Sequence, residues 1–335
     1  MRESADAANV KTREVRPGFH LVHLPLPTKP TIVNVYLVDG GSEWALIDTG
    51  MSTAESVEAF RAALDLVGCS PDRIAKIVCT HHHPDHFGTS GPYKELCHAE
   101  VFLHPLEAER VATYLPRPRS AATIAFFEKH GIPFDRFVNI PSPGEFWKGK
   151  YLPVTPDHAL ADGDRIPVGD REIEVVWTPG HSPGHCVMYF RREKVLVVGD
   201  HLLPKITPHI GVMSDTAGDP LGDFIASLRK VGDLDVDTVL PAHGAVYHDH
   251  RHRVAQLVEF HDYRMQSMLD IIRGRPATAY DVALEAFGLT SDSPFQQQFP
   301  ATFETLAHLE HMRVEGRTEK RIVGDRVVWR PTLVQ

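Results

Sequence analysis

The chain has 335 residues, 42% of them hydrophobic, which is enough for one large domain with a small addition. Its 35 Lys and Arg residues against 44 Asp and Glu residues give a net charge of -9, which argues against nucleic-acid scaffolds and membrane-surface binders, because both rely on a basic field. The N-terminal residues are polar and no apolar run reaches the roughly 18 residues of a membrane span, so we expect a cytoplasmic protein.

Short apolar runs typical of β-strands recur along the chain, and several are followed by helical patterns. These runs cover residues 33–38, 44–47, 74–79, 100–103, 173–177, 195–198 and 238–240. A helix is expected after the second run, because Ser52 and Glu55 fit a capping box and the apolar residues of 57–67 repeat at helical spacing. We therefore predict strands interleaved with helices that pack on a sheet.

Residues 105–156 interrupt this pattern with a stretch rich in proline, aromatic and charged residues, including the proline-rich segments 115–119 and 140–143. We predict a partly helical insertion here that can overhang a pocket. A long helical pattern follows Asp249 and ends at a Gly-Arg-Pro break at 274–276.

A separate terminal unit begins at this break. It is predicted to contain a helix from Thr278, a second helix that includes 303–312, and a hairpin that turns at 324–325. Helices followed by a two-stranded wing are typical of a winged-helix unit.

The predicted organisation is therefore a catalytic domain at 15–272 and a winged-helix-like domain at 273–335. Winged-helix units often bind DNA, but from residue 275 onward there are seven basic and eight acidic residues. This balance favours a role in packing or homodimerisation over nucleic-acid binding.

The segment 80–88 contains the motif H-x-H-x-D-H directly after the third apolar run. In a turn that leaves a strand, His81 and His83 can point to one metal ion, while Asp85 and His86 reach a second ion. Imidazole and carboxylate are ligands that zinc and similar divalent metals accept readily.

Three further candidate ligands, His181, Asp200 and His243, follow in order along the chain, each after an apolar run. Strand ends at one sheet edge are neighbours in space, so these residues are expected to complete two groups bridged by Asp200. The expected groups are His81, His83 and His181 for the first metal, and Asp85, His86 and His243 for the second. A single histidine of this kind is more often solvated or a cap, but four turns in consistent order favour a metal site.

These motifs resemble the metallo-β-lactamase superfamily, in particular its glyoxalase II-like hydrolases and the β-lactamase-like branch that includes an endoribonuclease. The resemblance covers about residues 15–330 and implies an αββα sandwich of the α+β class that binds two divalent metal ions, zinc first, with iron or manganese as alternatives. The endoribonuclease-containing branch also carries a C-terminal winged-helix-like unit, and His261 and Arg264 look like its His-x-x-Arg pair. The chain has no clear counterpart of the basic glutathione-binding residues, so the resemblance does not identify the substrate.

The site and the resemblance together predict a binuclear hydrolase in which a metal-bridging hydroxide attacks a small-molecule acyl substrate, with Asp85 and Asp200 as catalytic residues. A thioester is the first choice, and lactone and β-lactam opening use the same attack. Phosphodiester cleavage is an alternative that the near-neutral terminal unit weakens. Iron-dependent sulfur oxidation is a third alternative, against which the complete second ligand set argues.

Other polar residues are expected to play supporting roles. Asp48 follows an apolar run and is expected either to hold a ligand histidine or to cap its turn. His185 is expected to support the loop of His181 by hydrogen bonding, and the histidine-rich segment 248–252 to form a solvated helix start. The histidines expected to be mainly structural are His82, His104, His201 and His209. The four cysteines form no C-x-x-C pair and are expected to be reduced and mostly buried.

Overall fold

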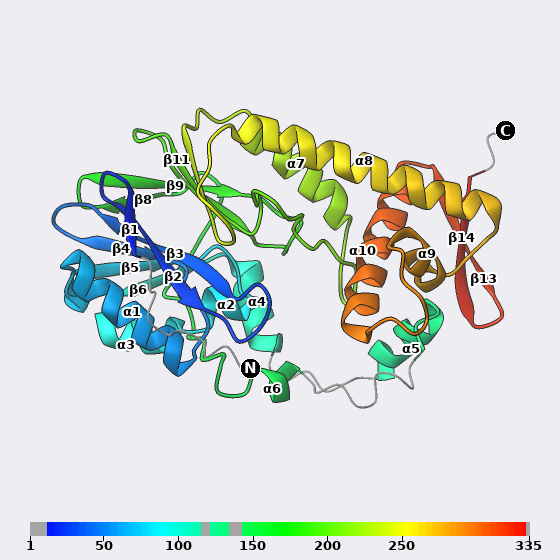
Figure 1. Ribbon diagram of the computed structural model, residues 1–335, viewed down its shortest axis with the longest axis horizontal. Helices are drawn as coiled ribbons and strands as arrows, with labels where there is room; N and C mark the ends of the chain where they lie inside the picture. The colour runs from blue at the N-terminus through cyan, green and yellow to red at the C-terminus, as the bar shows by residue number, and fades with distance from the viewer. Residues whose placement is uncertain (1–11, 115–120, 134–142, 333–335) are drawn as a thin grey trace, which may run out of the picture.

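The computed structural model describes residues 12–114, 121–133 and 143–332, and it contains two large β-sheets that pack face to face between layers of helices (Figure 1). Side chains of both sheets form the hydrophobic cluster between them, including Tyr36 from the first sheet and Met188 from the second. The predicted αββα sandwich is confirmed.

The first sheet has seven strands in the order β1-β2-β3-β4-β5-β6-β7. They are β1 (Arg13–Arg16), β2 (Phe19–Pro25), β3 (Ile32–Asp39), β4 (Trp44–Ile47), β5 (Ile74–Val78), β6 (Glu100–Leu103) and β7 (His158–Ala159). Neighbours pair antiparallel from β1 to β4 and parallel from β4 to β7. The H-x-H-x-D-H motif therefore leaves the carboxyl end of an interior strand, β5.

The second sheet has five strands in the order β12-β11-β10-β9-β8. They are β8 (Arg165–Val168), β9 (Arg171–Trp177), β10 (Cys186–Phe190), β11 (Val195–Gly199) and β12 (Thr238–Pro241). Because β10 runs antiparallel to both β9 and β11, and β12 runs parallel to β11, the strands β9, β11 and β12 all end at the same edge. His181, Asp200 and His243 follow these three ends.

Four helices cover the outer faces of the sheets, two on each side. They are α1 (Ala54–Val67) and α3 (Ser90–Cys97) on the first sheet, and α7 (Pro220–Gly232) and α8 (His250–Gly274) on the second. On the first sheet the rings of Phe60 and Tyr93 stack with centroids 4.2 Å apart. The apolar repeat of α1 faces the core as predicted, but the predicted cap is wrong by one residue, because the hydroxyl of Thr53 accepts the first-turn N–H of Ser56.

The terminal unit consists of two helices and a hairpin: α9 (Ala279–Ala286), α10 (Phe295–Val314), β13 (Thr318–Val323) and β14 (Arg326–Pro331). Val323 pairs with Arg326, which confirms the predicted turn at 324–325. The long helix α8 runs from the sheets to this unit, as Figure 1 shows in yellow. Helices α7, α8 and α10 contribute to one continuous hydrophobic cluster, which also contains Trp329 of β14. Assignment of the unit to the winged-helix class, and homodimerisation through it, stay predictions.

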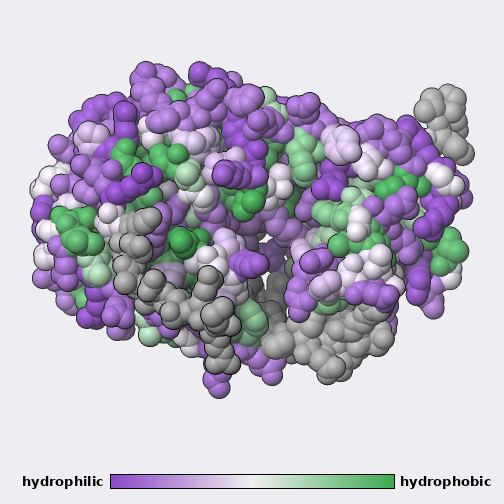
Figure 2. Space-filling view, viewed as in Figure 1, coloured by the Kyte–Doolittle hydropathy of each residue, from purple (hydrophilic) through white to green (hydrophobic). Residues whose placement is uncertain are grey.

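The predicted insertion contains three helices in its described residues: α4 (Pro105–Tyr114), α5 (Ala121–Lys129) and α6 (Pro143–Phe146). The segment 115–119 and most of 140–143 lie outside the described residues. Helix α5 lies against the terminal unit, where the rings of Phe127 and Phe303 are 5.9 Å apart. Figure 2 shows a hollow on the surface between the part formed by the sheets and the part formed by the terminal unit.

All seven predicted strand regions are confirmed, and so are the helices predicted from Asp249 and Thr278. The strands β1, β2, β7, β8 and β10 and the helices α3 and α7 were not predicted. In the described part of the chain, no helix has the length and apolar character needed to cross a membrane.

Candidate metal centre

The H-x-H-x-D-H motif begins in the turn after the strand β5 and ends in the short helix α2 (Pro84–Phe87). His81 and His83 lie in the turn after the strand, and Pro84 starts the helix, where its missing N–H and fixed φ are tolerated. Asp85 and His86 then lie within this one-turn helix. The change from turn to helix directs the two pairs of side chains into two adjacent groups.

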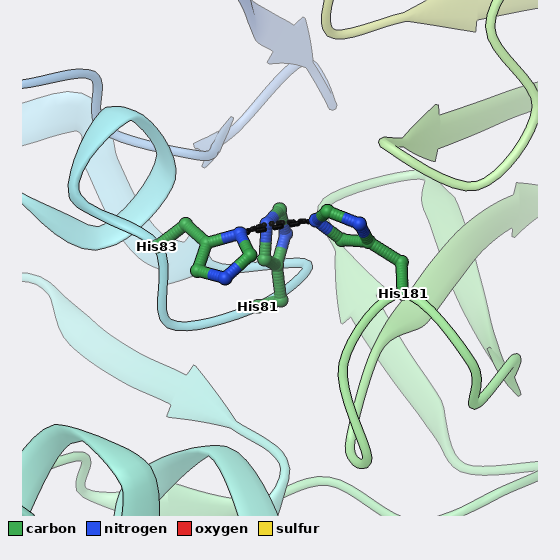
Figure 3. A group of neighbouring side chains, drawn as sticks. All are labelled: His81, His83 and His181. Carbon is green, nitrogen blue, oxygen red and sulfur yellow. Dashed lines mark hydrogen bonds between the residues drawn. The ribbon is translucent and has the colours of Figure 1, made fainter. Parts of the chain in front are cut away.

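The first group consists of His81, His83 and His181, whose rings converge from two loops (Figure 3). The Nδ1 atom of His83 lies 2.9 Å from Nε2 of His81 and 3.0 Å from Nε2 of His181. The two Nε2 atoms are 3.3 Å apart. Three nitrogens bound to one zinc ion at about 2.0–2.1 Å with tetrahedral angles would be separated by about 3.3 Å, so this triangle fits such an ion.

The second group consists of Asp85, His86 and His243. The Oδ2 atom of Asp85 lies 3.3 Å from Nε2 of His243 and 3.7 Å from Nε2 of His86. One carboxylate and two imidazoles form a donor set that zinc, iron and manganese accept.

Asp200 lies between the two groups. Its Oδ2 atom is 3.6 Å from Nε2 of His181 in the first group and 3.5 Å from Nε2 of His86 in the second, and its Oδ1 atom is 3.5 Å from Nε2 of His243. All seven predicted ligands are therefore brought together, and Asp200 occupies the position predicted for the bridge.

Each of four histidines in the centre has its Nδ1 atom engaged away from the centre, which leaves its Nε2 atom facing inward. His181 donates to the carbonyl of His209 at 2.9 Å, and His243 donates to the carbonyl of Ile32 at 3.0 Å. A carbonyl can only accept, so these bonds place the proton on Nδ1 and leave Nε2 free to bind a cation. The other two are His81, whose Nδ1 contacts Thr80 Oγ1 at 3.0 Å, and His86, whose Nδ1 contacts Asp48 Oδ2 at 2.9 Å.

Asp48 is the shared support behind two of these contacts. Its carboxylate accepts the hydroxyl of Thr80, the backbone N–H of Thr80 at 2.7 Å and the Nδ1–H of His86. The prediction that Asp48 holds a ligand histidine is thus confirmed. Thr80 was not expected to take part, because its role depends on contacts across two strands and not on a local motif.

Electrostatics in the centre suit a cation. Burial lowers the pKa of His81 and His83 well below the usual range, and the neighbouring histidines lower it further, so both rings are neutral, the form that binds metals. Burial would also lower the pKa of His86, but the carboxylates of Asp200, Asp85 and Asp48 outweigh burial and raise it well above that range. These carboxylates concentrate negative charge around an inward-facing nitrogen.

Burial would raise the pKa of Asp200, but His86, His243 and His181 outweigh burial and hold it well below the usual range, so the carboxyl is ionised. Its Oδ1 atom and the Nε2 atom of His86 are buried without a hydrogen-bond partner. Such unpaired buried polar atoms are costly unless an ion satisfies them. The residues therefore fit two divalent cations.

Comparison with known proteins supports the same assignment. The family model of the Metallo-beta-lactamase superfamily matches residues 28–243, a range that includes all seven residues of the centre. The chain belongs to the metallo-β-lactamase superfamily. It is accordingly a metal-dependent hydrolase, a class also named among its relatives.

Two relatives show how similar this chain is in sequence to other proteins of the superfamily, and over what length. It is 26% identical to the probable metallo-hydrolase YqjP of Bacillus subtilis over 307 residues, covering 88% of this chain and 92% of the relative. It is 33% identical to the acyl-coenzyme A thioesterase MBLAC2 of Bos taurus over 226 residues, covering 63% of this chain and 72% of the relative.

Two solved structures are similar to this chain over more residues than the family model, which matches residues 28–243. A metallo-beta-lactamase family protein from Thermus thermophilus is 32% identical, with a TM-score of 0.82 over 95% of this chain and 100% of that protein. A beta-lactamase domain protein from Burkholderia ambifaria is 25% identical, with a TM-score of 0.84 over 97% of this chain and 94% of that one. Both matches cover nearly the whole chain, so these proteins share its terminal unit in fold.

Several other predicted roles can be read from the structure. His185 supports the centre by hydrogen bonds, as predicted, because its Nδ1 contacts Thr178 Oγ1 and its Nε2 accepts the backbone N–H of Asp200. His201 is buried, and the ring of His104 stacks on Trp177. The histidine-rich segment was predicted to be solvated, and for one member this is wrong: the ring of His250 is buried at the start of α8, while His248 and His252 are exposed.

Glu304 on α10 is a titratable group that the sequence analysis did not single out. Its Oε2 atom lies 3.9 Å from Nδ1 of His209, whose carbonyl holds His181, so it lies behind the metal centre. Burial raises the pKa of Glu304 to about 7, against the opposing charge of Arg264. Two residues far apart in the sequence are brought together here, which no local pattern could have shown.

Replacing Glu304 by glutamine is expected to change how stability depends on pH. The folded protein holds the proton of Glu304 up to about pH 7, whereas the ordinary pKa is 4.5, so ionisation disfavours the folded state as pH rises between these values. The free energy of unfolding of Glu304→Gln relative to the parent should therefore rise from pH 5 to pH 8, by up to about 3 kcal/mol. Urea denaturation of both proteins at several pH values measures this difference. The same experiment with Glu128→Gln, at an exposed position on α5, should give a nearly flat difference, and a flat difference for Glu304→Gln would refute the prediction.

Proposed function

We propose that this chain binds two divalent metal ions, zinc in the first instance, and hydrolyses a small-molecule acyl thioester. The observation that carries the proposal is the placement of Asp200 between two complete groups of three ligands each. His81, His83 and His181 would hold one ion and Asp85, His86 and His243 the other. When bound, the two ions would supply a nucleophilic hydroxide at neutral pH and would polarise the acyl carbonyl.

The protein's own contribution is orientation and charge. The contacts of Nδ1 atoms with Thr80, Asp48 and backbone carbonyls orient the four rings so that their Nε2 atoms face inward, where a bound cation would take the place of any proton on Nε2. Three carboxylates, Asp48, Asp85 and Asp200, offset most of the positive charge of two dications. We assign Asp85 to accept the proton of the attacking water, because it supplies the carboxylate of the second ligand group. Hydrolysis would break the carbon–sulfur bond of the thioester and release a carboxylate and a thiol.

The thioester class is supported by two sequence similarities. Relatives named as acyl-coenzyme A thioesterases are 30 to 33% identical over about two thirds of the chain. The resemblance to glyoxalase II-like hydrolases in the metal-binding motifs points to the same bond type. Lactones, β-lactams and phosphodiesters are the competing substrates.

The proposal is tested with purified protein in two measurements. Elemental analysis should find two equivalents of a transition metal per chain. A panel of acyl-coenzyme A thioesters, a lactone, a β-lactam and an RNA should show fastest turnover of a thioester, and the activity should be lost after chelation and recovered when zinc is added. The Asp200→Asn protein, purified in parallel, excludes a contaminating thioesterase. Faster cleavage of RNA, or a single iron ion per chain, would contradict the proposal.

A further inference from the structure

A buried carboxylate outside the metal centre joins the two loops that form the first ligand group. His82 lies between His81 and His83 and is 5% exposed, and its ring contacts Glu107 outside the centre. Both its backbone N–H and its Nδ1 atom contact the same oxygen, Oε2 of Glu107, at 2.9 and 2.5 Å. Glu107 lies on α4 and is fully buried.

The other oxygen of Glu107 binds the second loop. Its Oε1 atom accepts the backbone N–H of Gly184 at 2.6 Å, three residues after His181. One side chain thus spans the loop that carries His81 and His83 and the loop that carries His181, which Figure 3 shows on either side of the three rings.

The approach of the second loop to Glu107 requires glycine. A Cβ atom on Gly184 would lie 2.8 Å from Cγ of Glu107 and 2.6 Å from Nδ1 of His104, closer than a Cβ atom packs against any non-bonded heavy atom. The hydroxyl of Tyr151 donates to the carbonyl of His82 at 2.9 Å and holds the first loop from a second direction. The contact is therefore a closely fitted arrangement of buried polar groups.

Glu107 is ionised in this position. Burial would raise its pKa, but the ring of His82 and the backbone N–H groups of His82 and Gly184 outweigh burial and hold the pKa well below the usual range. A buried charge with three donors is held in one geometry, because any displacement leaves it partly unpaired.

The second ligand group does not depend on Glu107. His86 is held by Asp48, and His243 is held by the carbonyl of Ile32. Asp48 supports both groups, because Thr80 links it to His81, whereas the contacts of Glu107 lie on the loops that carry His81, His83 and His181.

We propose that Glu107 is a positioning residue that sets the separation of the two loops and thereby the metal affinity of the group formed by His81, His83 and His181. This inference rests on the proposed metal binding at that group. It adds that the two ions respond differently to a change at Glu107.

The test is a metal titration of Glu107→Gln, which keeps the length of the side chain but removes its charge and presents an NH2 group to N–H donors. Titration with Co²⁺, followed by its visible absorption, resolves successive binding steps, and elemental analysis after dialysis against fixed free Zn²⁺ gives the stoichiometry. The affinity for the ion at His81, His83 and His181 should fall about 10- to 100-fold, which is the usual effect of losing a residue that orients metal ligands. The affinity for the other ion should be unchanged. At intermediate free Zn²⁺ the variant should therefore hold one ion where the parent holds two.

Two further variants separate positioning from general destabilisation. Gly184→Ala places a Cβ atom against Glu107 and the ring of His104 without changing any charge, and it should weaken the same ion. Gln298→Glu is the matched control, since Gln298 is a fully buried side chain in the terminal unit that accepts from Tyr280 and donates to three backbone carbonyls. It should lower thermal stability at least as much as Glu107→Gln but should retain both metal affinities.

The outcomes distinguish this inference from the proposed function. If the parent binds two ions and Glu107→Gln retains both affinities, the role of Glu107 is refuted and the proposed function stands. Equal weakening of both ions, matched by Gln298→Glu, would also refute it. A parent protein that binds no transition metal would refute the proposed function itself. If Glu107→Gln does not fold, Gly184→Ala decides the question by the same titration.

Discussion

Replacing Asp200 by asparagine should lower hydrolysis by at least about 100-fold and weaken the binding of both metal ions. Its carboxylate lies 3.5 to 3.6 Å from ring nitrogens of both ligand groups, so its charge acts on both sites. Asparagine has nearly the same shape, but it removes one negative charge and directs an NH2 donor at either a cation or an inward-facing nitrogen. Steady-state kinetics with the best substrate of the panel, together with elemental analysis, measures both effects.

The control for Asp200→Asn is a histidine on the same side of the fold but outside the centre. His252 is exposed on the first turn of α8, and its described side-chain contact is with Gln256. His252→Ala should leave metal content and turnover nearly unchanged. Two bound ions and near-normal turnover in Asp200→Asn would show that the bridge has been assigned to the wrong residue.

Ending the chain at Gly274 should prevent cooperative folding of the remaining residues. The core formed by α7 and α8 continues into the terminal unit through Phe303, Leu309 and Trp329, each at most 2% exposed. Each buried apolar side chain of this size contributes about 1.5–3 kcal/mol, so uncovering a few of their partners removes an amount comparable with the whole stability of about 5–15 kcal/mol. Near-ultraviolet circular dichroism and urea denaturation of the truncated protein measure the loss.

A single substitution in the full chain tests the same packing by a measurable loss of stability. Phe303→Ala in the full chain should reduce the free energy of unfolding by about 3–5 kcal/mol. If residues 1–274 alone unfolded cooperatively at the same urea concentration as the full chain, the terminal unit would be an independent domain and not part of the core.

The grouping of the seven candidate ligands was predictable from the sequence because these residues follow strand ends in short motifs. The strand period and the motif H-x-H-x-D-H together placed His81, His83, Asp85 and His86 in one turn. The residues that support them were harder to predict. Asp48 could be found because it also follows a strand, whereas Glu107 reaches the centre only through the packing of α4, which leaves no trace in local spacing.

Among the elements, one error has a local physical cause. The cap of α1 was misplaced because Ser52 and Thr53 are adjacent and both suit the position, and only backbone geometry distinguishes them. The helix α7 was missed although Asp219 and Pro220 form a typical helix start, and its apolar residues repeat at helical spacing. Strand β10 is buried along its whole length, as are the predicted strands β4 and β11, so its burial pattern does not explain why it was missed.

The candidate ligands come from both sheets, so metal binding would affect the stability of the folded chain. Four of them leave the first sheet and three leave the second, so each bound ion links two halves of the sandwich. Because the unfolded chain cannot present these groups together, binding favours the folded state, by about 2.7 kcal/mol for an ion present at 100 times its dissociation constant. If the proposed ions bind, a shortage of metal would therefore lower the stability of the folded protein as well as its activity.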